Sequence, residues 1–134
     1  MSEFWLATAI GAGSGAALLA LFARLPERQL ADLGYLALIS MLAIYIGARL
    51  VTGDITDVVL ETVGATSAAI LVRVLMTRWL PAIGAAILLH GCYDALVGPH
   101  TGVVNWYPPL CAGFDLIVGA GLLVILSRKR KAAD

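Results

Sequence analysis

The sequence predicts an all-α membrane protein: a bundle of five transmembrane helices forming a single integral membrane domain over residues 1–134. Composition is the first reason. Hydrophobic residues make up 60% of the chain and charged residues 13%, about half the charge of an average soluble domain. A soluble protein of this size has too little interior to hide so much apolar surface from water. The other two reasons are the lengths of the apolar stretches and the places of the basic residues.

Five apolar stretches reach or approach the roughly 20 residues that a helix needs to cross a bilayer. Charged residues or turn formers separate them, such as Arg24 and Pro26 after the first stretch and Gly98-Pro99 after the fourth. The first stretch is expected to stay in the mature protein, because no basic residue precedes it as in a signal peptide. The predicted helices span residues 4–23, 33–51, 55–76, 80–97 and 109–127.

The basic residues predict how the helices are oriented. Cytoplasmic loops of membrane proteins carry an excess of Lys and Arg. With a cytoplasmic C-terminus, Arg49 is the one basic residue of the nine that falls outside. We therefore predict an N-terminus outside and a C-terminus in the cytoplasm, in the inner (plasma) membrane of a bacterial-type cell. The predicted cytoplasmic residues are Arg24, Arg28, Arg73, Arg78 and the tail Arg128-Lys129-Arg130-Lys131.

Small residues recur at helical spacing on two of the predicted helices. Gly11 and Gly15 form one such pair, and Gly64 and Ala68 form another. These faces allow close approach of two helices in a membrane. They fit packing within the chain and association into a homo-oligomer equally well. The predicted partner is thus the lipid bilayer, a homo-oligomer through these faces is left open, and no nucleic acid is expected.

Four ionisable residues lie within the predicted helices and away from their basic ends: Glu61, His90, Asp94 and Asp115. Ionisable side chains are costly in a bilayer and therefore point to a functional site. With 1.5 Å of rise per residue, all four lie about 5 to 10 Å below the outer membrane surface. Three helices thus bring polar groups to a similar depth, which predicts one outward-facing pocket.

Other polar residues are predicted to extend this pocket. Arg49 ends the second stretch near the same level and is the expected counter-charge for one carboxylate. The loop before the last stretch could cover the pocket, although Trp and Tyr at this level also form the ordinary aromatic belt of a membrane interface. The predicted ligand-binding residues are Glu61, His90, Asp94, Asp115, Arg49, His100, Trp106 and Tyr107.

Three kinds of chemistry would use such a pocket. A divalent metal ion would take His90, Asp94 and Asp115 as ligands. An intramembrane enzyme acting on a lipid or isoprenoid-type substrate would use Glu61, Asp94 or Asp115 as its catalytic acid or base. A carrier would use the same acids to bind a cation or to relay protons. Cys92 and Cys111 show no zinc or disulfide spacing, and a bridge between them is left open.

The leading functional hypothesis is a pocket that binds a cation or a small polar ligand in a transport-related role. The alternatives are the lipid enzyme and a structural or accessory subunit whose polar residues only fix helix packing. A lipid enzyme requires an apolar groove from the pocket to the bilayer. A carrier requires polar continuity to the inside, and an accessory subunit requires paired polar groups without a cavity.

Part of the chain resembles small bacterial multi-pass membrane proteins grouped as a domain of unknown function. In these proteins a His-x-x-x-Asp helix precedes a proline-bearing loop and a last helix with Cys and Asp. The resemblance covers residues 85–120 and implies the location of a site, with no activity attached. It rests on Leu88-Leu89-His90-Gly91-Cys92-Tyr93-Asp94, Gly98-Pro99-His100, Trp106-Tyr107-Pro108 and the segment from Cys111 to Asp115.

Overall fold

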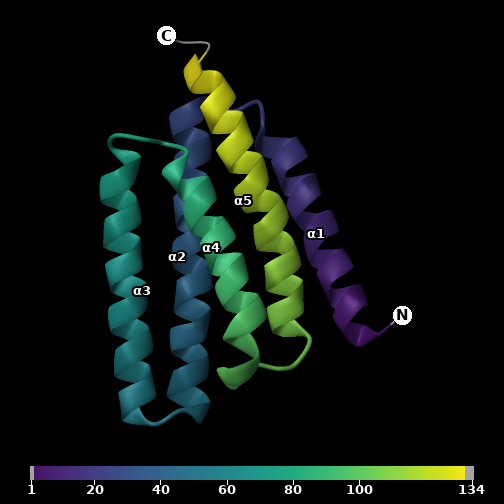
Figure 1. Ribbon diagram of the computed structural model, residues 1–134, viewed down its shortest axis with the longest axis vertical. Coiled ribbons are helices and arrows are strands. Elements are labelled where there is room, and N and C mark those ends of the chain that lie inside the picture. Colours follow the sequence, from purple (N-terminus) through teal and green to yellow (C-terminus); the bar gives the residue numbers. More distant parts are fainter. Residues whose placement is uncertain (1, 132–134) are drawn as a thin grey trace.

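The computed structural model describes residues 2–131 and confirms the all-α class with five α-helices (Figure 1). The chain runs up and down the bundle, so that consecutive long helices are antiparallel. A short 3-10 turn, η1, lies between the last two helices. The elements are α1 (Glu3–Phe22), α2 (Glu27–Thr52), α3 (Ile55–Met76), α4 (Ala82–Leu96), η1 (Gly98–His100) and α5 (Tyr107–Lys131).

The helix bounds follow the prediction most closely for α3 and depart from it at α2, α4 and α5. Helix α2 begins six residues early because Glu27 directly follows Pro26, and charged helix formers continue the helix before its apolar stretch. Helix α5 starts at Tyr107, with Pro108 and Pro109 in the first turn, where the missing N–H groups cost nothing. Helix α4 is shorter than predicted, since Pro81 lies just before its first residue.

Four helices, α1, α2, α3 and α5, are long and apolar enough to cross a membrane. Helix α4 is equally apolar but has 15 residues, a length of about 22 Å at 1.5 Å per residue. Large apolar side chains cover the outside of the bundle, among them Leu21 and Val51, which are 71% and 85% exposed. Such a surface suits a hydrocarbon environment, as expected for a membrane protein.

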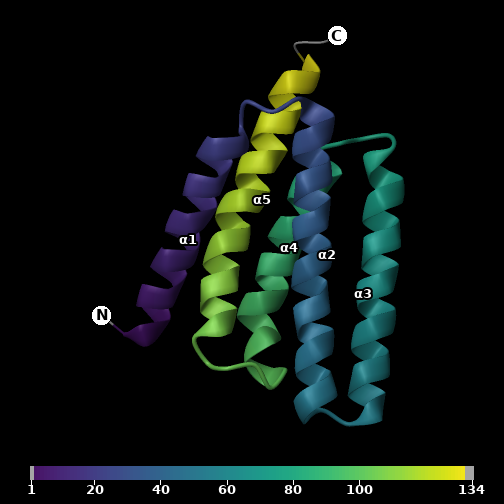
Figure 2. The ribbon, with the colours of Figure 1, turned by 180° about the vertical axis from the view of Figure 1, so that it is seen from behind.

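Helix α5 lies between α1 and α4, and α3 stands at the far edge beside α2 (Figure 2). Glycines bring the central helices together. A Cβ at Gly11 of α1 would collide with the carbonyl oxygen of Leu110, and a Cβ at Gly84 of α4 would lie 2.5 Å from the Leu123 nitrogen. The small-residue face of α1 is therefore used inside the chain. The second predicted face behaves differently, because a Cβ at Gly64 would meet no atom within 4 Å.

The interior is divided along the length of the bundle. The half that contains the α1–α2 and α3–α4 connections has an apolar core, built from residues such as Leu30, Ile83 and Leu126. The other half contains the buried polar residues His90, Asp94 and Asp115. The two halves therefore have different chemistry, and the candidate site lies in the polar one.

Candidate functional site

Two helices build a buried polar cluster, which we define as His90, Asp94 and Asp115. His90 and Asp94 are four residues apart on one face of α4, and Asp115 projects from α5. His90 Nδ1 lies 2.8 Å from Asp115 Oδ2 and 3.4 Å from Asp94 Oδ2. The helices can approach this closely because Gly91 has no side chain. A Cβ there would lie only 2.9 Å from the Asp115 Cβ. The convergence of these three side chains agrees with the depth argument from sequence.

A tyrosine from a third helix completes the contacts of Asp94. The hydroxyl of Tyr45, on α2, donates a hydrogen bond to Asp94 Oδ1 at 2.5 Å. Tyr45 is 1% exposed, and a Cβ at Gly98 would lie 2.8 Å from its hydroxyl oxygen. The cluster is thus held by α2, α4 and α5 together.

Several polar atoms of the cluster have no hydrogen-bond partner among residues 2–131. They are His90 Nε2, Asp94 Oδ2 and Asp115 Oδ1. Buried polar atoms in folded proteins are nearly always paired. With His90 neutral the cluster carries a charge of −2, and with His90 protonated it carries −1. Unpaired acceptors and negative charge together favour a cation or a hydrogen-bond donor as ligand.

The polar cluster has the donor set of a divalent metal site. Each of its three residues offers one ligand atom, and these atoms all lie within 4.8 Å of one another. Imidazole and carboxylate ligands suit zinc and other divalent transition metals. The unpaired carboxylate oxygens of Asp94 and Asp115 would be satisfied by such an ion. The residues therefore fit a metal, which they would hold through His90 and the two carboxylates.

The same residues also form a proton-transfer pair. Because ionised Asp115 can only accept, His90 Nδ1–H donates to it, and this contact fixes the orientation of the ring. The second ring nitrogen, Nε2, is buried and has no hydrogen-bond partner among residues 2–131. A histidine oriented by a carboxylate in this way is suited to general acid–base chemistry.

A second polar group lies beside the cluster, and we call it the Arg49 group: Arg49, Asp57, Glu61 and Tyr93. The Tyr93 hydroxyl contacts both Glu61 carboxylate oxygens at 2.9 Å. Arg49 Nη1 lies 3.3 Å from Asp57 Oδ2, and Arg49 Nε lies 3.7 Å from Glu61 Oε2. Glu61 thus sits in this Arg49 group, one step removed from the three residues of the polar cluster. The rings of Tyr93 and His90 stack with centroids 6.0 Å apart and connect the two groups.

A cavity of about 580 Å³ lies between α2, α3 and α4, and we call it the α2–α4 cavity. All four residues of the Arg49 group line it, as does His90. These polar residues come from the C-terminal parts of α2 and α4 and the first turns of α3, which lie at one end of the bundle (Figure 1). The remaining lining is nearly all apolar and includes Leu38, Leu42, Leu60, Gly64, Ala65, Ala68, Leu71, Val72, Ala86 and Leu89.

The predicted loop residues lie away from this cavity. His100 is exposed and contacts Arg49 only through its backbone carbonyl, at 3.3 Å. Trp106 is 46% exposed and packs edge-on against Tyr107. Tyr107 lines a separate small cavity with Thr52 and Gly102. Cys92 and Cys111 are free thiols, so no bridge joins them.

Tyr45 and Tyr93 are the site residues that the sequence analysis did not single out. A signal was available for each: Tyr45 precedes Arg49 by four residues on one helix face, and Tyr93 is next to Asp94. No family model, curated protein or solved structure matches this chain, so comparison with known proteins assigns no role to these residues.

Proposed function

We propose that this chain is a multi-pass plasma-membrane protein that binds an amphiphilic ligand of lipid or isoprenoid type in the α2–α4 cavity. The observation that carries this proposal is the unequal lining of the cavity. Its polar end offers Arg49, Glu61, Tyr93 and His90 to a head group, and its apolar remainder offers leucine, valine and alanine side chains to a tail.

The dimensions of the cavity suit such a ligand. A volume of about 580 Å³ lies within the usual range of roughly 300 to 1,000 Å³ for small-molecule sites. Along α3 the lining runs from Asp57 to Val72, a distance of about 22 Å at 1.5 Å per residue. That length exceeds half of a hydrocarbon core of about 30 Å, so one extended chain could lie along it.

The cavity is open on the side of the bundle that would face lipid. Leu60 and Leu89 line it and are nevertheless 66% and 71% exposed, one on α3 and one on α4. A ligand dissolved in the bilayer could enter between these helices without leaving the apolar phase. This feature supports a lipid-type ligand over a small polar one that arrives from water.

The far end of the cavity also bears on the choice between the alternatives. It is lined by Leu38, Leu71 and Val72, which offer no ligand to a cation moving toward the inside. An accessory role would need no cavity of this kind.

Within our proposal His90 is the group placed to move a proton at a bound substrate, because it lines the cavity and Asp115 accepts a hydrogen bond from its Nδ1.

A substitution that fills the cavity tests the proposal. Gly64 lines the cavity and a Cβ there would meet nothing within 4 Å, so Gly64→Leu places its side chain in the empty space. Gly13, exposed on α1 and equally open, provides the matched control Gly13→Leu. Binding of dansyl-labelled farnesyl phosphate and of fluorescent phosphatidic acid is measured on protein in nanodiscs.

The parent and Gly13→Leu should bind at least one of these probes saturably, and Gly64→Leu should weaken its binding at least tenfold. Unchanged binding by Gly64→Leu would contradict the proposal. So would the absence of saturable binding of both probes to the folded parent.

A divalent cation at the polar cluster is the second candidate, and it retains the cation-binding hypothesis from sequence. The unpaired oxygens of Asp94 and Asp115 favour it. Elemental analysis of the purified parent should then find close to one zinc or similar ion per chain. The ion should be lost from His90→Ala while the helical circular dichroism is kept. A metal-free parent that takes up no added zinc would remove this candidate.

A further inference from the structure

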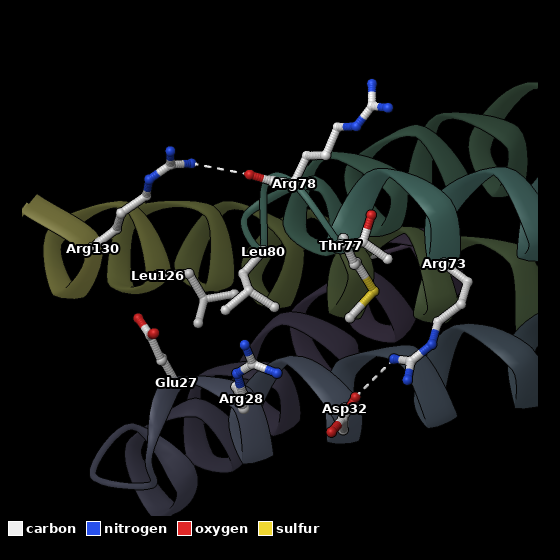
Figure 3. Close-up of a pocket in the computed structure, with 10 residues that line it drawn as sticks. Glu27, Arg28, Asp32, Arg73, Thr77, Arg78, Leu80, Leu126 and Arg130 are labelled. Carbon is white, nitrogen blue, oxygen red and sulfur yellow. Dashed lines mark hydrogen bonds and ion pairs between the residues drawn. The ribbon is translucent and has the colours of Figure 1, made fainter.

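A second cavity, of about 310 Å³, is drawn in Figure 3. Its lining residues place it at the end of the bundle opposite the polar cluster. Four arginines line it, and we call it the arginine pocket: Arg28 on α2, Arg73 on α3, Arg78 after α3 and Arg130 on α5. Three helices and one connection thus place arginines around one hollow, and Figure 3 shows the Arg28 guanidinium directed into it and the Arg78 guanidinium directed away from Arg28. The positive-inside rule accounts for basic residues at this end of the bundle. It does not require that they line one pocket.

The charges of the pocket are not balanced within it. Four arginines face two acids, Glu27 and Asp32, which gives a net charge of +4 − 2 = +2. Arg73 is committed to Asp32, with Nη1 and Oδ1 2.9 Å apart. In the part of the chain that the structure describes, Arg28 and Arg78 have no acidic partner within 4.0 Å. The Arg28 guanidinium, which points into the pocket, therefore remains available to an anion, and Arg78 adds an unpaired positive charge at the edge of the pocket.

The positions of these side chains suit a ligand that is partly apolar. Figure 3 shows the Arg28 guanidinium directed from α2 toward Leu80, with Leu126 beside it. Arg130 donates to the backbone carbonyl of Arg78 at 3.4 Å, which holds the end of α5 next to the α3–α4 connection. The pocket thus combines a basic rim with an apolar floor of leucines at the level where the helices end.

We propose that the arginine pocket binds the phosphate group of an anionic lipid from the inner leaflet. Arginine offers a planar fork of donors that matches phosphate oxygens in pairs. Basic pockets between transmembrane helices on the cytoplasmic side are suited to anionic lipid head groups. The leucine floor gives the glycerol and first acyl carbons an apolar contact, which a free phosphate ion would not use.

The test compares two double variants that remove the same charge. Arg28→Gln/Arg78→Gln removes two pocket arginines that have no ion pair among residues 2–131. Arg24→Gln/Arg128→Gln removes two arginines of the same end that do not line it. All four side chains are exposed, so folding should survive in both variants. Binding of phosphatidylglycerol and of phosphatidylcholine is measured by native mass spectrometry, on the parent and in a Gly64→Leu background that blocks the α2–α4 cavity.

The parent should bind phosphatidylglycerol at least tenfold more tightly than phosphatidylcholine. The pocket variant should lose that preference, and the control variant should keep it within about a factor of two. Equal losses in the two variants would overturn the proposal, because they would show a general effect of surface charge. Displacement of phosphatidylglycerol by millimolar inorganic phosphate would overturn the lipid assignment and leave a site for free anions.

Discussion

Removing the charge of Asp115 should leave the stability unchanged or raised, whereas removing His90 should lower it. Asp115→Asn keeps the shape of the side chain and an oxygen that accepts from His90 Nδ1. His90→Ala instead leaves two carboxylates facing each other without a counter-charge. The polar cluster is buried, with His90 7%, Asp94 0% and Asp115 1% exposed, so solvent screens neither change.

The structure gives the size of each effect. At 2.8 Å and an effective dielectric constant near 20, protonated His90 attracts Asp115 by about 6 kcal/mol. At the 4.8 Å limit of the cluster, Asp94 repels Asp115 by about 3.5 kcal/mol. Asp115→Asn therefore forfeits a difference of about 2.5 kcal/mol, and it removes a desolvation penalty of several kcal/mol for the buried ion. The sum is near zero or stabilising.

His90→Ala should cost about 3 to 5 kcal/mol, the usual result of stranding a buried charge. Thermal unfolding in detergent, followed by tryptophan fluorescence and by circular dichroism, compares the two variants with the parent. Asp115→Asn should melt at or above the parent temperature and His90→Ala clearly below it. If Asp115→Asn melts as far below the parent as His90→Ala, the cluster only staples the helices, and its functional interpretation is refuted.

Three further predictions concern the orientation of the chain, the contact of α1 with α5 and the hydrogen bond of Tyr45. A reporter that is active only in the cytoplasm should work when fused after Asp134, and one that is active only outside should work in the 98–108 loop; the reverse pattern would invert the orientation. Gly11→Leu should prevent normal packing of α1 on α5 and lower the yield of folded protein, whereas Gly13→Leu should not; equal yields would show that the close approach is unimportant. Tyr45→Phe should cost about 1.5 to 3 kcal/mol in thermal unfolding, because a buried hydrogen bond to a carboxylate is lost. The control is Tyr35→Phe, which removes a part-buried hydrogen bond to the backbone carbonyl of Ala69; a loss no greater than in this control would show that the Tyr45 bond adds little.

The helices were predictable because their signals are strong and local. Apolar length, together with the charged residues and turn formers between the stretches, located all five, and α3 has the predicted bounds of 55–76. The ends of the others depend on capping and proline chemistry that hydropathy does not register. The polar residues Glu27 and Arg28 extend α2, and Pro108 and Pro109 are accommodated in the first turn of α5.

The candidate site was predictable only as far as depth and helix face determine it. These two properties were enough to group His90 and Asp94 with Asp115. They could not show that Glu61 pairs with Tyr93 and Arg49, since the rotation of α3 relative to α4 depends on tertiary packing. Hydroxyl groups such as that of Tyr45 were overlooked because tyrosine is an ordinary residue in an apolar helix, whereas carboxylates are rare there.

The cavity itself could not be predicted, because it results from packing that is incomplete between particular helices. Gly64 and Ala68 have the spacing of a helix-contact motif, as do Gly11 and Gly15. In the structure Gly11 and Gly15 lie against α5, whereas Gly64 and Ala68 line the α2–α4 cavity. The same sequence pattern thus lies at a tight helix contact on α1 and beside an unfilled cavity on α3.

Photocrosslinking tests the central claim, an amphiphile site between α2, α3 and α4, most directly. The protein in nanodiscs is irradiated with a diazirine-bearing farnesyl phosphate, and the labelled positions are mapped by peptide mass spectrometry. Labelling should concentrate on cavity residues such as Leu42, Ala68 and Leu89, and excess unlabelled farnesyl phosphate should suppress it. Labelling spread equally over the exposed face of α1, without competition, would contradict the account.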